Sequence, residues 1–361
     1  MALTDYVTLG RSGLRVSPFC LGTMTFGEDW GWGTPVSESE AILSRFLDLG
    51  GNFIDTANMY TKGHAEKIIG DFFKGDRRRR DRVVLATKYS ANMYSGDPNG
   101  GGSSAKTIIE ACEQSLRRLN TDYIDLYWQH AWDNFTPMEE TLRAMDNLVN
   151  SGKIRYIGLS DTPAWKVAQA QMITHFRGWT PLIALQIEYS LLERTVEDEL
   201  IPMALEMGLG VIPWSPLRGG FLSGKFRRGD ASAAAGSRKE GLAVSLGDRE
   251  FSIIEALDQI ASAHDTTPAA VALAWVQSRA GVASTIIGAR RIEQLEANMS
   301  ALDLRLSTQE INGLNELSKP APTFLEWVKS ISPNSFQNGM TVNGRTSQES
   351  PSAPTGDDPC Y

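Results

Sequence analysis

Eight short apolar runs recur along the chain, and each ends at a glycine or at a polar or aromatic residue. The ends lie near Gly22, Asp55, Lys88, His130, Ser160, Gln186, Trp214 and Gly288. The runs are apolar almost without interruption, which predicts parallel strands with both faces buried, because a strand with one wet face alternates polar and apolar residues. Ahead of them, residues 5–9 and 14–17 flank a Gly-Arg-Ser-Gly sequence and predict a short hairpin.

Segments with the spacing of amphipathic helices separate the strands. Leu43, Phe46 and Leu47 form one apolar stripe at positions i, i+3 and i+4, and similar stripes follow later in the chain. Capping boxes and threonine–proline pairs predict where helices start. These signals occur at Ser37-x-x-Glu40, Thr136-Pro137, Thr162-Pro163 and Thr267-Pro268.

The alternation of strands and helices predicts an α/β fold, a (β/α)8 TIM barrel, because right-handed crossovers close eight such units into a ring. A doubly wound open sheet is the alternative, but the sequence lacks its G-x-G-x-x-G turn. Residues 1–318 are predicted to form one catalytic barrel domain, with a mobile flap between Pro216 and Asp248. Residues 319–361 form a C-terminal extension with an amphipathic patch at Phe324, Trp327 and Val328, and composition predicts flexibility for about its last thirty residues.

Composition narrows the class of protein. Hydrophobic residues make up 42% of the chain, charged residues 22%, and the formal net charge is -8. An acidic balance argues against nucleic acid as a partner, and the Arg77–Arg80 run is expected to be a solvated corner. No apolar run is long enough for a bilayer and no export signal is visible, so we expect a cytoplasmic protein that does not bind membranes. Three scattered cysteines predict reduced thiols and no metal site.

Polar residues at the strand ends supply the candidate chemistry, because function in such barrels lies at the carboxyl ends of the strands. Asp55, Lys88 and His130 end three successive strands, and Tyr60 follows the first of them. A nearby ammonium favours the phenolate and so eases proton donation by Tyr60. Asp55 would hold the Lys88 ammonium and His130 would orient a carbonyl oxygen. This set suits protonation of a carbonyl group as hydride arrives at its carbon.

The later strand ends suit a hydride donor. Trp214 could lie against a nicotinamide ring, with Ser160, Asp161 and Gln186 around its carboxamide. The segment from Gly288 opens the last helix beside Arg290 and Arg291, which is an anion site that favours the 2'-phosphate of NADPH. The plainer interpretation of that segment is an exposed helix start whose arginines meet only water.

Several motifs then match one known family. They are GGNFIDTANMY, ATK, YIDLYWQH, GKIRYIGLSD, QIEYSLLER, VIPWSPLRGGFLSGK and IIGARRIEQLEAN. With them the sequence resembles the aldo-keto reductases from about Leu9 to Asp303, in the form of the longer members that have tryptophan at position 214 and are related to potassium-channel β-subunits. The resemblance implies that Asp55, Tyr60 as the acid, Lys88 and His130 take the four catalytic positions.

The resemblance also implies that NADP(H) lies extended across the barrel mouth. Its contacts would come from Thr23, Met24, Asp55, Ser160, Asp161, Gln186, Trp214, Ser215, Leu217, Gly219, Lys225, Gly288, Arg290, Gln294 and Asn298. Two positions depart from the family pattern. Asp161 stands where asparagine is frequent, and Ala297 stands where many relatives have glutamate, which weakens one adenosine contact.

Aromatic residues are predicted to line the substrate side. They are Trp30, Trp32, Tyr89 and Trp132. Apolar walls favour a neutral small-molecule carbonyl substrate such as an aldehyde, a ketone or a keto-sugar. The predicted function is NADPH-dependent carbonyl reduction. The alternatives are a cofactor-bound redox-sensing subunit, and an isomerase or aldolase that uses Lys88 as a nucleophile. The sequence makes no prediction of oligomeric state.

Overall fold

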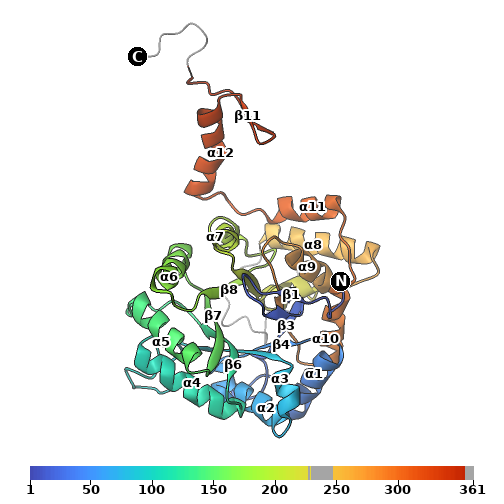
Figure 1. Cartoon of the computed structure of the whole chain (residues 1–361). Helices are drawn as coiled ribbons and strands as arrows, with labels where there is room; N and C mark the ends of the chain where they lie inside the picture. The colour runs from blue at the N-terminus through green and yellow to red at the C-terminus, as the bar shows by residue number, and fades with distance from the viewer. Residues whose placement is uncertain (227, 229–246, 354–361) are drawn as a thin grey trace. The chain divides into compact units, whose positions relative to one another are not determined.

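The computed structural model describes residues 1–226, 228 and 247–353, and the chain divides into two units, Met1–Ser318 and Lys319–Tyr361. The first unit contains eight parallel strands in the order β10-β3-β4-β5-β6-β7-β8-β9 (Figure 1). They are β3 (Phe19–Gly22), β4 (Phe53–Asp55), β5 (Val84–Tyr89), β6 (Ile124–Gln129), β7 (Ile154–Ser160), β8 (Leu182–Glu188), β9 (Gly210–Trp214) and β10 (Thr285–Gly288). An isolated parallel bridge joins Val211 of the outer strand β9 to Val282, three residues before the other outer strand, β10. The predicted (β/α)8 barrel is therefore confirmed as a nearly closed ring.

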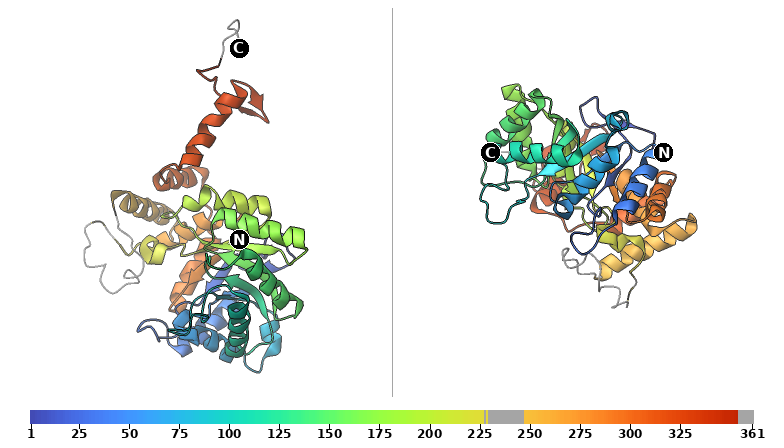
Figure 2. Two further views of the ribbon diagram at one scale, coloured as in Figure 1. Left: turned by 90° about the vertical axis from the view of Figure 1, so that its left-hand side faces the viewer. Right: turned by 90° about the horizontal axis from the view of Figure 1, so that it is seen from below.

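Helices surround the ring of strands (Figures 1 and 2). The α-helices of this unit are α1 (Val36–Asp48), α2 (His64–Phe73), α3 (Arg77–Asp81), α4 (Ala105–Leu119), α5 (Met138–Asn150), α6 (Ala164–Arg177), α7 (Leu200–Met207), α8 (Asp248–Ala263), α9 (Pro268–Gln277), α10 (Ile292–Met299) and α11 (Thr308–Ser318). The 3₁₀ turns include η1 (Tyr60–Gly63), η2 (Thr195–Glu197), η3 (Arg218–Ser223) and η6 (Ser300–Leu302). The helices return the chain between successive strands, which is why neighbouring strands run parallel.

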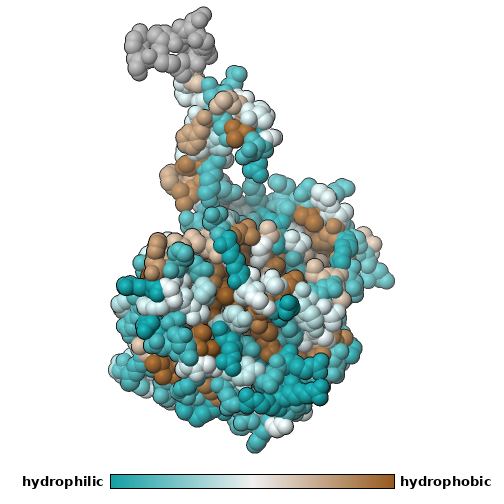
Figure 3. Space-filling view, viewed as in Figure 1, coloured by the Kyte–Doolittle hydropathy of each residue, from teal (hydrophilic) through white to brown (hydrophobic). Residues whose placement is uncertain are grey.

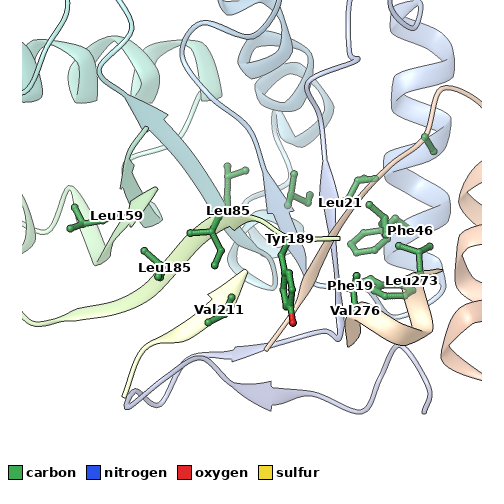
Figure 4. Packing of buried hydrophobic residues seen from close by; sticks show 14 of the residues in the cluster. Phe19, Leu21, Phe46, Leu85, Leu159, Leu185, Tyr189, Val211, Leu273 and Val276 are labelled. Carbon is green, nitrogen blue, oxygen red and sulfur yellow. The ribbon is translucent and has the colours of Figure 1, made fainter. Parts of the chain in front are cut away.

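Alternate residues of each strand face opposite sides of the ring. In β3, Phe19 and Leu21 belong to the large buried cluster between strands and helices, together with Phe46 of α1 and Leu273 of α9 (Figure 4). Cys20, which lies between them in sequence, belongs to a second buried cluster. The strand residues of that cluster are Cys20, Phe53, Val84, Ala86, Leu126, Trp128, Ile183, Ala184 and Ile212. This second cluster fills the barrel interior, so both strand faces are dry.

The N-terminal hairpin closes the lower end of the barrel. Its strands, β1 (Val7–Thr8) and β2 (Arg15–Val16), pair in antiparallel fashion, as predicted. Leu9 is fully buried in the interior cluster. The chain turns at Gly10 with a φ of 56°, and a Cβ there would lie 2.2 Å from the carbonyl oxygen of Ile183 at the start of β8. Only glycine allows this approach, so the hairpin fits the barrel end without room to spare.

The structure corrects three of the four predicted helix starts. In α1, α5 and α6 a proline occupies the N-cap position and no side chain caps the helix. Ser37 and Glu40 lie inside α1, whereas Thr136 and Thr162 donate their hydroxyl groups to other oxygen atoms. Thr267 does cap α9, by accepting a hydrogen bond of 3.1 Å from the backbone N–H three residues on. Sequence signals placed these helices correctly but misassigned their first residues by one or two positions.

Arg80 contradicts the prediction that the four-arginine run is solvated. Its side chain is buried and donates to the carbonyl groups of Val83 and Tyr123, at 3.0 and 2.9 Å. It also pairs with Asp125 at 2.8 Å. A buried guanidinium needs such partners, because an unpaired charge is costly away from water. Arg80 therefore ties α3 to the beginnings of β5 and β6, which four identical residues in a row could not reveal.

The second unit contains one helix and a hairpin, α12 (Phe324–Gln337), β11 (Thr341–Val342) and β12 (Arg345–Thr346). No residue of α12 is buried, and Phe324, Trp327 and Phe336 are among its exposed apolar side chains. Hydrophobic residues are visible on the surface of this unit (Figure 3). The hairpin occupies part of the stretch predicted to be flexible, and the end of that stretch lies outside the described residues. In the part of the chain that the structure describes, no helix has both the length and the apolar character needed to span a bilayer.

The burial of Leu9 beside the N-terminal hairpin leads to a prediction about stability. Replacing Leu9 by alanine should lower the free energy of unfolding by about 3 kcal/mol, because the fixed barrel end cannot collapse around the cavity that is left. Urea titration followed by tryptophan fluorescence measures this loss. Leu317→Ala, at an exposed position of α11, is the matched control and should change stability by less than about 1 kcal/mol. Equal losses in the two variants would show that the hairpin does not support the barrel.

Candidate active site

Strand ends bring the four residues predicted to be catalytic to one end of the barrel. Asp55 ends β4, Lys88 is the penultimate residue of β5, and His130 follows β6. Asp55 comes two positions after Phe53 in β4, and Lys88 comes two positions after Ala86 in β5. Phe53 and Ala86 belong to the interior cluster, so the side chains of Asp55 and Lys88 also face the barrel interior. Tyr60 reaches the same volume from η1, the turn after β4. The barrel mouth is therefore polar at the level where its interior stops being apolar.

Lys88 is the centre of this group. Its Nζ pairs with Asp55 Oδ2, donates to the carbonyl oxygen of Thr56 at 2.9 Å, and donates to the hydroxyl of Tyr60 at 3.1 Å. These contacts use all three donors of the ammonium group, whose side chain is fully buried. Gln186 Nε2 donates to the other carboxylate oxygen of Asp55 at 3.0 Å. The predicted cluster of Asp55, Tyr60 and Lys88 is thus brought together, and Gln186, predicted as a cofactor contact, supports Asp55.

The electrostatics of the Lys88–Asp55 pair keep both groups ionised. Burial alone lowers the pKa of Lys88, but the charge of Asp55 and the hydrogen bonds to Asp55 and Tyr60 raise it above its ordinary value. Burial raises the pKa of Asp55, while Lys88 and Gln186 oppose this rise. Because lysine is by far the more basic partner, the proton stays on its nitrogen. A fixed positive charge therefore lies beside the Tyr60 hydroxyl.

Tyr60 is held in a tight turn and remains a neutral phenol. The two residues after it, Thr61 and Lys62, have φ values of 45° and 58°, a left-handed conformation that reverses the chain ahead of α2. Burial raises the pKa of Tyr60 above its ordinary value, Lys88 lowers it, and Asp55 adds to the rise. The sequence correctly predicted the direction of the lysine effect. Burial nevertheless outweighs it, so Tyr60 keeps its proton at neutral pH.

His130 lies against Tyr60 with the ring centroids 5.8 Å apart and the planes nearly perpendicular. Burial, and then the charge of Lys88, lower the pKa of His130 to about 3. At pH 7 only about one imidazole in 10⁴ would be protonated. Among the described residues, none forms a hydrogen bond with its buried Nδ1. His130 is therefore a neutral imidazole that can donate or accept a hydrogen bond but cannot serve as a proton source.

Asp161 and Trp214 form the next part of the mouth. The indole Nε1 of Trp214 donates to Asp161 Oδ1 at 3.0 Å, and Asp161 itself has a φ of 42°. The surrounding protein raises the pKa of Asp161 to about 6 by desolvation, although Trp214 and Lys88 oppose the rise. Ser160, at the end of β7, is buried beside it. Asp161 and Trp214 line a hollow of about 360 Å³ at this edge of the mouth.

The predicted cofactor positions after β9 are Ser215, Leu217, Gly219 and Lys225. The loop bends through left-handed residues, with φ values of 52° at Ser215, 48° at Arg218 and 63° at Gly219. Ser215 Oγ accepts a hydrogen bond of 3.2 Å from the backbone N–H of Gly219. Leu217 is half-buried against the large core cluster, and Lys225 is exposed. Most of the flap predicted between Pro216 and Asp248 lies outside the described residues.

The start of α10 is braced by two of its own side chains. Gln294 accepts a hydrogen bond of 2.8 Å from the backbone N–H of Arg290, and Asn298 donates to the carbonyl oxygen of Gly288 at 3.3 Å. The side chains of Arg290 and Arg291 are exposed, and Arg291 lies 3.9 Å from Glu293. A Cβ at Gly288 would meet open space. The structure therefore brings all these predicted residues to one helix start.

Thr23 and Met24 begin the loop that follows β3. Thr23 is buried, and both its backbone N–H and its hydroxyl donate to the carbonyl oxygen of Asp55 at 3.0 Å. Met24 is 37% exposed. Thr23 thus orders the backbone of Asp55 from the neighbouring strand, whereas Met24 is accessible at the surface.

The residues predicted for the substrate side divide into two groups. Trp30, Trp32 and Trp132 are half-buried or exposed, and the ring centroids of Trp30 and Trp32 lie 5.5 Å apart. Tyr89 is different, because it is fully buried and its hydroxyl contacts the sulfur of Met145 at 3.6 Å. Tyr89 occupies the last position of β5, where the alternation of the strand turns it outward to the core beneath the helices. Its predicted place on the substrate side is therefore wrong.

Two interactions near the site were not predicted. Arg218 pairs with Glu188 and links the loop after β9 to the end of β8. Glu66 is fully buried in α2, accepts a hydrogen bond from Thr87 Oγ1 at 2.6 Å, and pairs with Arg118 at 2.6 Å. It thereby supports Thr87, the strand residue just before Lys88. A glutamate on the apolar face of a helix was the one sequence signal of this support.

Within residues 1–226, 228 and 247–353, no group of three or more His, Cys, Asp or Glu side chains is arranged to hold a metal ion. Cys20 and Cys112 are free and buried.

The buried ion pair gives a second stability prediction. Asp55→Asn removes the charge that compensates the Lys88 ammonium, so the free energy of unfolding should fall by about 3 kcal/mol. Denaturant titration at pH 7 measures it. Asp71→Asn removes the same charge from the exposed Lys67–Asp71 pair and should cost about 0.5 kcal/mol or less. If the two variants lose stability equally, the buried Lys88–Asp55 pair contributes no more to the free energy of unfolding than the exposed Lys67–Asp71 pair does.

Comparison with known proteins agrees with the geometry. A model of the aldo/keto reductase family matches residues 18–319. An oxidoreductase of Bacillus subtilis, YrpG, is 39% identical over 322 residues, which cover 87% of this chain and 95% of that protein. Norsolorinic acid reductase A of Aspergillus parasiticus is 36% identical over 316 residues, covering 84% and 78%.

An aryl-alcohol dehydrogenase [NADP(+)] of Phanerodontia chrysosporium is also similar, with 34% identity over 326 residues that cover 84% of this chain and 83% of the relative. The matched region contains the whole ring of strands and every residue of the mouth described above. Its relatives are oxidoreductases by name. The chain therefore belongs to the aldo/keto reductase family.

Proposed function

We propose that the protein is an NADPH-dependent carbonyl reductase in which Tyr60 donates a proton to the carbonyl oxygen. The observation that carries this proposal is the 3.1 Å contact between Lys88 Nζ and the Tyr60 hydroxyl, in a place where the ammonium is fully buried. A charge in such surroundings acts on its neighbours far more strongly than it would in water. The pair therefore provides a proton donor whose conjugate base is stabilised in advance.

The proton step follows from the state of each group. NADPH, when bound, would supply hydride to the carbonyl carbon. As the carbonyl oxygen gains negative charge it becomes more basic than a phenolate, so Tyr60 gives its proton to that oxygen. The phenolate that remains is stabilised by Lys88, which Asp55 holds in position. The high pKa of Tyr60 is no obstacle, because the alkoxide that accepts the proton is a stronger base.

His130 would orient the substrate and leave the proton step to Tyr60. Its pKa of about 3 keeps the imidazole neutral at neutral pH, so a hydrogen bond to the carbonyl oxygen is the contribution it can make. The edge-to-face contact with Tyr60 keeps the two rings about the same small volume. Both groups can then face one oxygen atom, which fixes the direction from which a carbonyl enters.

The residues present fit a nicotinamide cofactor. Open space surrounds Gly288 and Gly220, where a Cβ would meet no atom within 4 Å, so an extended anion can approach the backbone closely at both residues. The exposed Arg290 and Arg291 at the start of α10 supply positive charge for a 2'-phosphate. Trp214 offers an aromatic face beside the mouth. We therefore assign NADP(H) to this surface, with Ser215, Leu217 and Gly219 along the pyrophosphate, as the family resemblance implies.

Asp161 would contact the nicotinamide carboxamide, with Ser160 beside it. The carboxylate already accepts the indole N–H of Trp214, and its second oxygen is available as an acceptor for an amide NH₂ group. Its raised pKa of about 6 means that it is ionised at neutral pH and protonated in mildly acidic solution. Asparagine, frequent here in relatives, would accept a hydrogen bond at either pH.

The aromatic rim supports an aryl aldehyde or aryl ketone as the substrate class. Trp30, Trp32 and Trp132 offer large faces that suit flat apolar ligands. The relatives include proteins named for aryl alcohols and for norsolorinic acid. Schiff-base chemistry by Lys88 is disfavoured, because its raised pKa keeps the amine protonated and thus not nucleophilic.

Tyr60→Phe tests the assigned acid. The variant keeps the ring but has no proton to give, so turnover of an aromatic aldehyde should fall by about 10³-fold or more. The affinity for NADPH, followed by quenching of tryptophan fluorescence, should stay within about twofold. Tyr6→Phe, at an exposed tyrosine whose hydroxyl donates to the carbonyl oxygen of Gly50, is the matched control and should retain full activity. Persistent turnover in Tyr60→Phe would remove Tyr60 from the role of acid.

Arg290 and Arg291 test the preference for NADPH. Replacing both by alanine removes two charge-assisted contacts with a phosphate, so the Kd for NADPH should rise by about 50-fold, while that for NADH should change by less than about twofold. Arg45→Ala is the control, because Arg45 pairs with Glu296 on the same helix α10 at 2.8 Å. It should leave both affinities unchanged. Equal losses for the two cofactors would show that these arginines do not meet the 2'-phosphate.

A further inference from the structure

The loop after β3 is a closed structure that carries two of the aromatic residues of the rim. Residues 25–34 return on themselves, because the backbone N–H of Thr34 donates to the carbonyl of Thr25 at 2.7 Å and that of Gly27 donates to the carbonyl of Thr34 at 2.9 Å. Trp30 and Trp32 stand on this loop with their rings 5.5 Å apart. We call residues 25–34 the aromatic loop. Because backbone hydrogen bonds join its two ends, we expect the aromatic loop to behave as a single unit.

Two contacts join the aromatic loop to the turn that positions Tyr60. Thr61 Oγ1 donates to the carbonyl oxygen of Phe26 at 2.7 Å, and both residues are fully buried. His64 Nδ1 contacts Asp29 Oδ2 at 2.6 Å, with each side chain about one third exposed. Thr61 follows Tyr60 directly and His64 is the first residue of α2. The loop that bears the tryptophans is thus attached on the acid's own turn.

Gly27 makes this attachment possible. Its φ is 88°, and a Cβ there would lie 3.0 Å from Asp29 Oδ2, 3.1 Å from His64 Nδ1 and 3.2 Å from Thr61 Oγ1. Three polar atoms from the loop and the turn therefore converge on a residue without a side chain. The buried contact through Thr61 fixes the base of the loop. The Asp29–His64 contact holds the tip of the loop, because Asp29 directly precedes Trp30.

We propose that Asp29 and His64 are positioning residues that hold the aromatic loop at a fixed distance from Tyr60 and so set the selectivity for aryl over small aliphatic carbonyl substrates. This inference rests on the proposed function. The contact lies one residue before Trp30, so its loss removes a direct link between the tip of the aromatic loop and the first residue of α2. A flat aryl group needs that fixed aromatic face, whereas a small aldehyde uses only Tyr60 and His130. The effect belongs to substrate binding and not to the proton step.

Steady-state kinetics with 2-naphthaldehyde and propanal test the proposal. Asp29→Ala and His64→Ala should each lower the kcat/KM ratio of naphthaldehyde over propanal by about fivefold, with the loss in the KM for naphthaldehyde. The double variant should lose no more than either single variant, because both remove the same contact. The reversed pair, Asp29→His with His64→Asp, should recover most of the selectivity. Additive losses, or equal losses for the two aldehydes, would overturn the proposal.

Asp71→Ala is the matched control, because it removes an exposed ion pair with Lys67 on the same helix α2 but away from the loop. It should leave the selectivity ratio unchanged, and a loss equal to that of Asp29→Ala would overturn the proposal. A second measurement is independent of activity. The near-ultraviolet circular dichroism of the tilted Trp30–Trp32 pair should weaken in Asp29→Ala and His64→Ala but not in Asp71→Ala. An unchanged signal in the first two variants would contradict the positioning role.

The two measurements separate failure of this inference from failure of the proposed function. If none of the carbonyl compounds tested causes the wild-type protein to oxidise NADPH, the proposal of carbonyl reduction is wrong. The circular dichroism comparison alone then decides whether Asp29 and His64 fix the loop. If the wild-type protein is active but the selectivity ratio is unchanged in both single variants, carbonyl reduction stands and the positioning role falls.

Discussion

The burial of one ammonium group constrains the rest of the barrel mouth. Lys88 has no contact with water, so its charge must be balanced nearby, and Asp55 on the neighbouring strand does this. Asp55 in turn accepts a hydrogen bond from Gln186 on the opposite side of the ring, and its backbone carbonyl oxygen accepts one from the hydroxyl of Thr23. Three strands and a loop are therefore committed to keeping one positive charge in place. The charge is then available to the phenol of Tyr60.

The barrel can maintain this arrangement because its interior is dry and closed below. The strand residues that face the barrel interior are apolar until the strands reach the mouth. The N-terminal hairpin, with Leu9, closes the end of the barrel opposite the mouth. Water can reach the polar groups only from the mouth. This separation follows from the alternation of a β-strand, which sends every second residue inward. The same alternation decides whether a strand-end residue meets the mouth or, like Tyr89, the surrounding core.

Within the mouth, one environment gives neighbouring groups different tasks. Burial and a fixed positive charge make His130 neutral, so it can only form hydrogen bonds, while the same charge stabilises the phenolate form of Tyr60. Asp161 lies farther out, where the raised pKa of about 6 leaves it ionised at neutral pH and able to hold Trp214. The protonation states of Tyr60, His130 and Asp161 therefore differ with their burial and with the effect of the Lys88 charge on each.

The sequence by itself determined the eight strands, their parallel order and the residues that end them, because apolar runs and helical spacing are local patterns that a short window of residues contains. It also gave the direction in which Lys88 acts on Tyr60. Only the tertiary structure decided which distant residues become partners: Gln186 with Asp55, Arg80 with Asp125, and Asp29 with His64. Such contacts join residues far apart in the chain. Their existence depends on register and side-chain direction, which are settled only when the strands close into a ring.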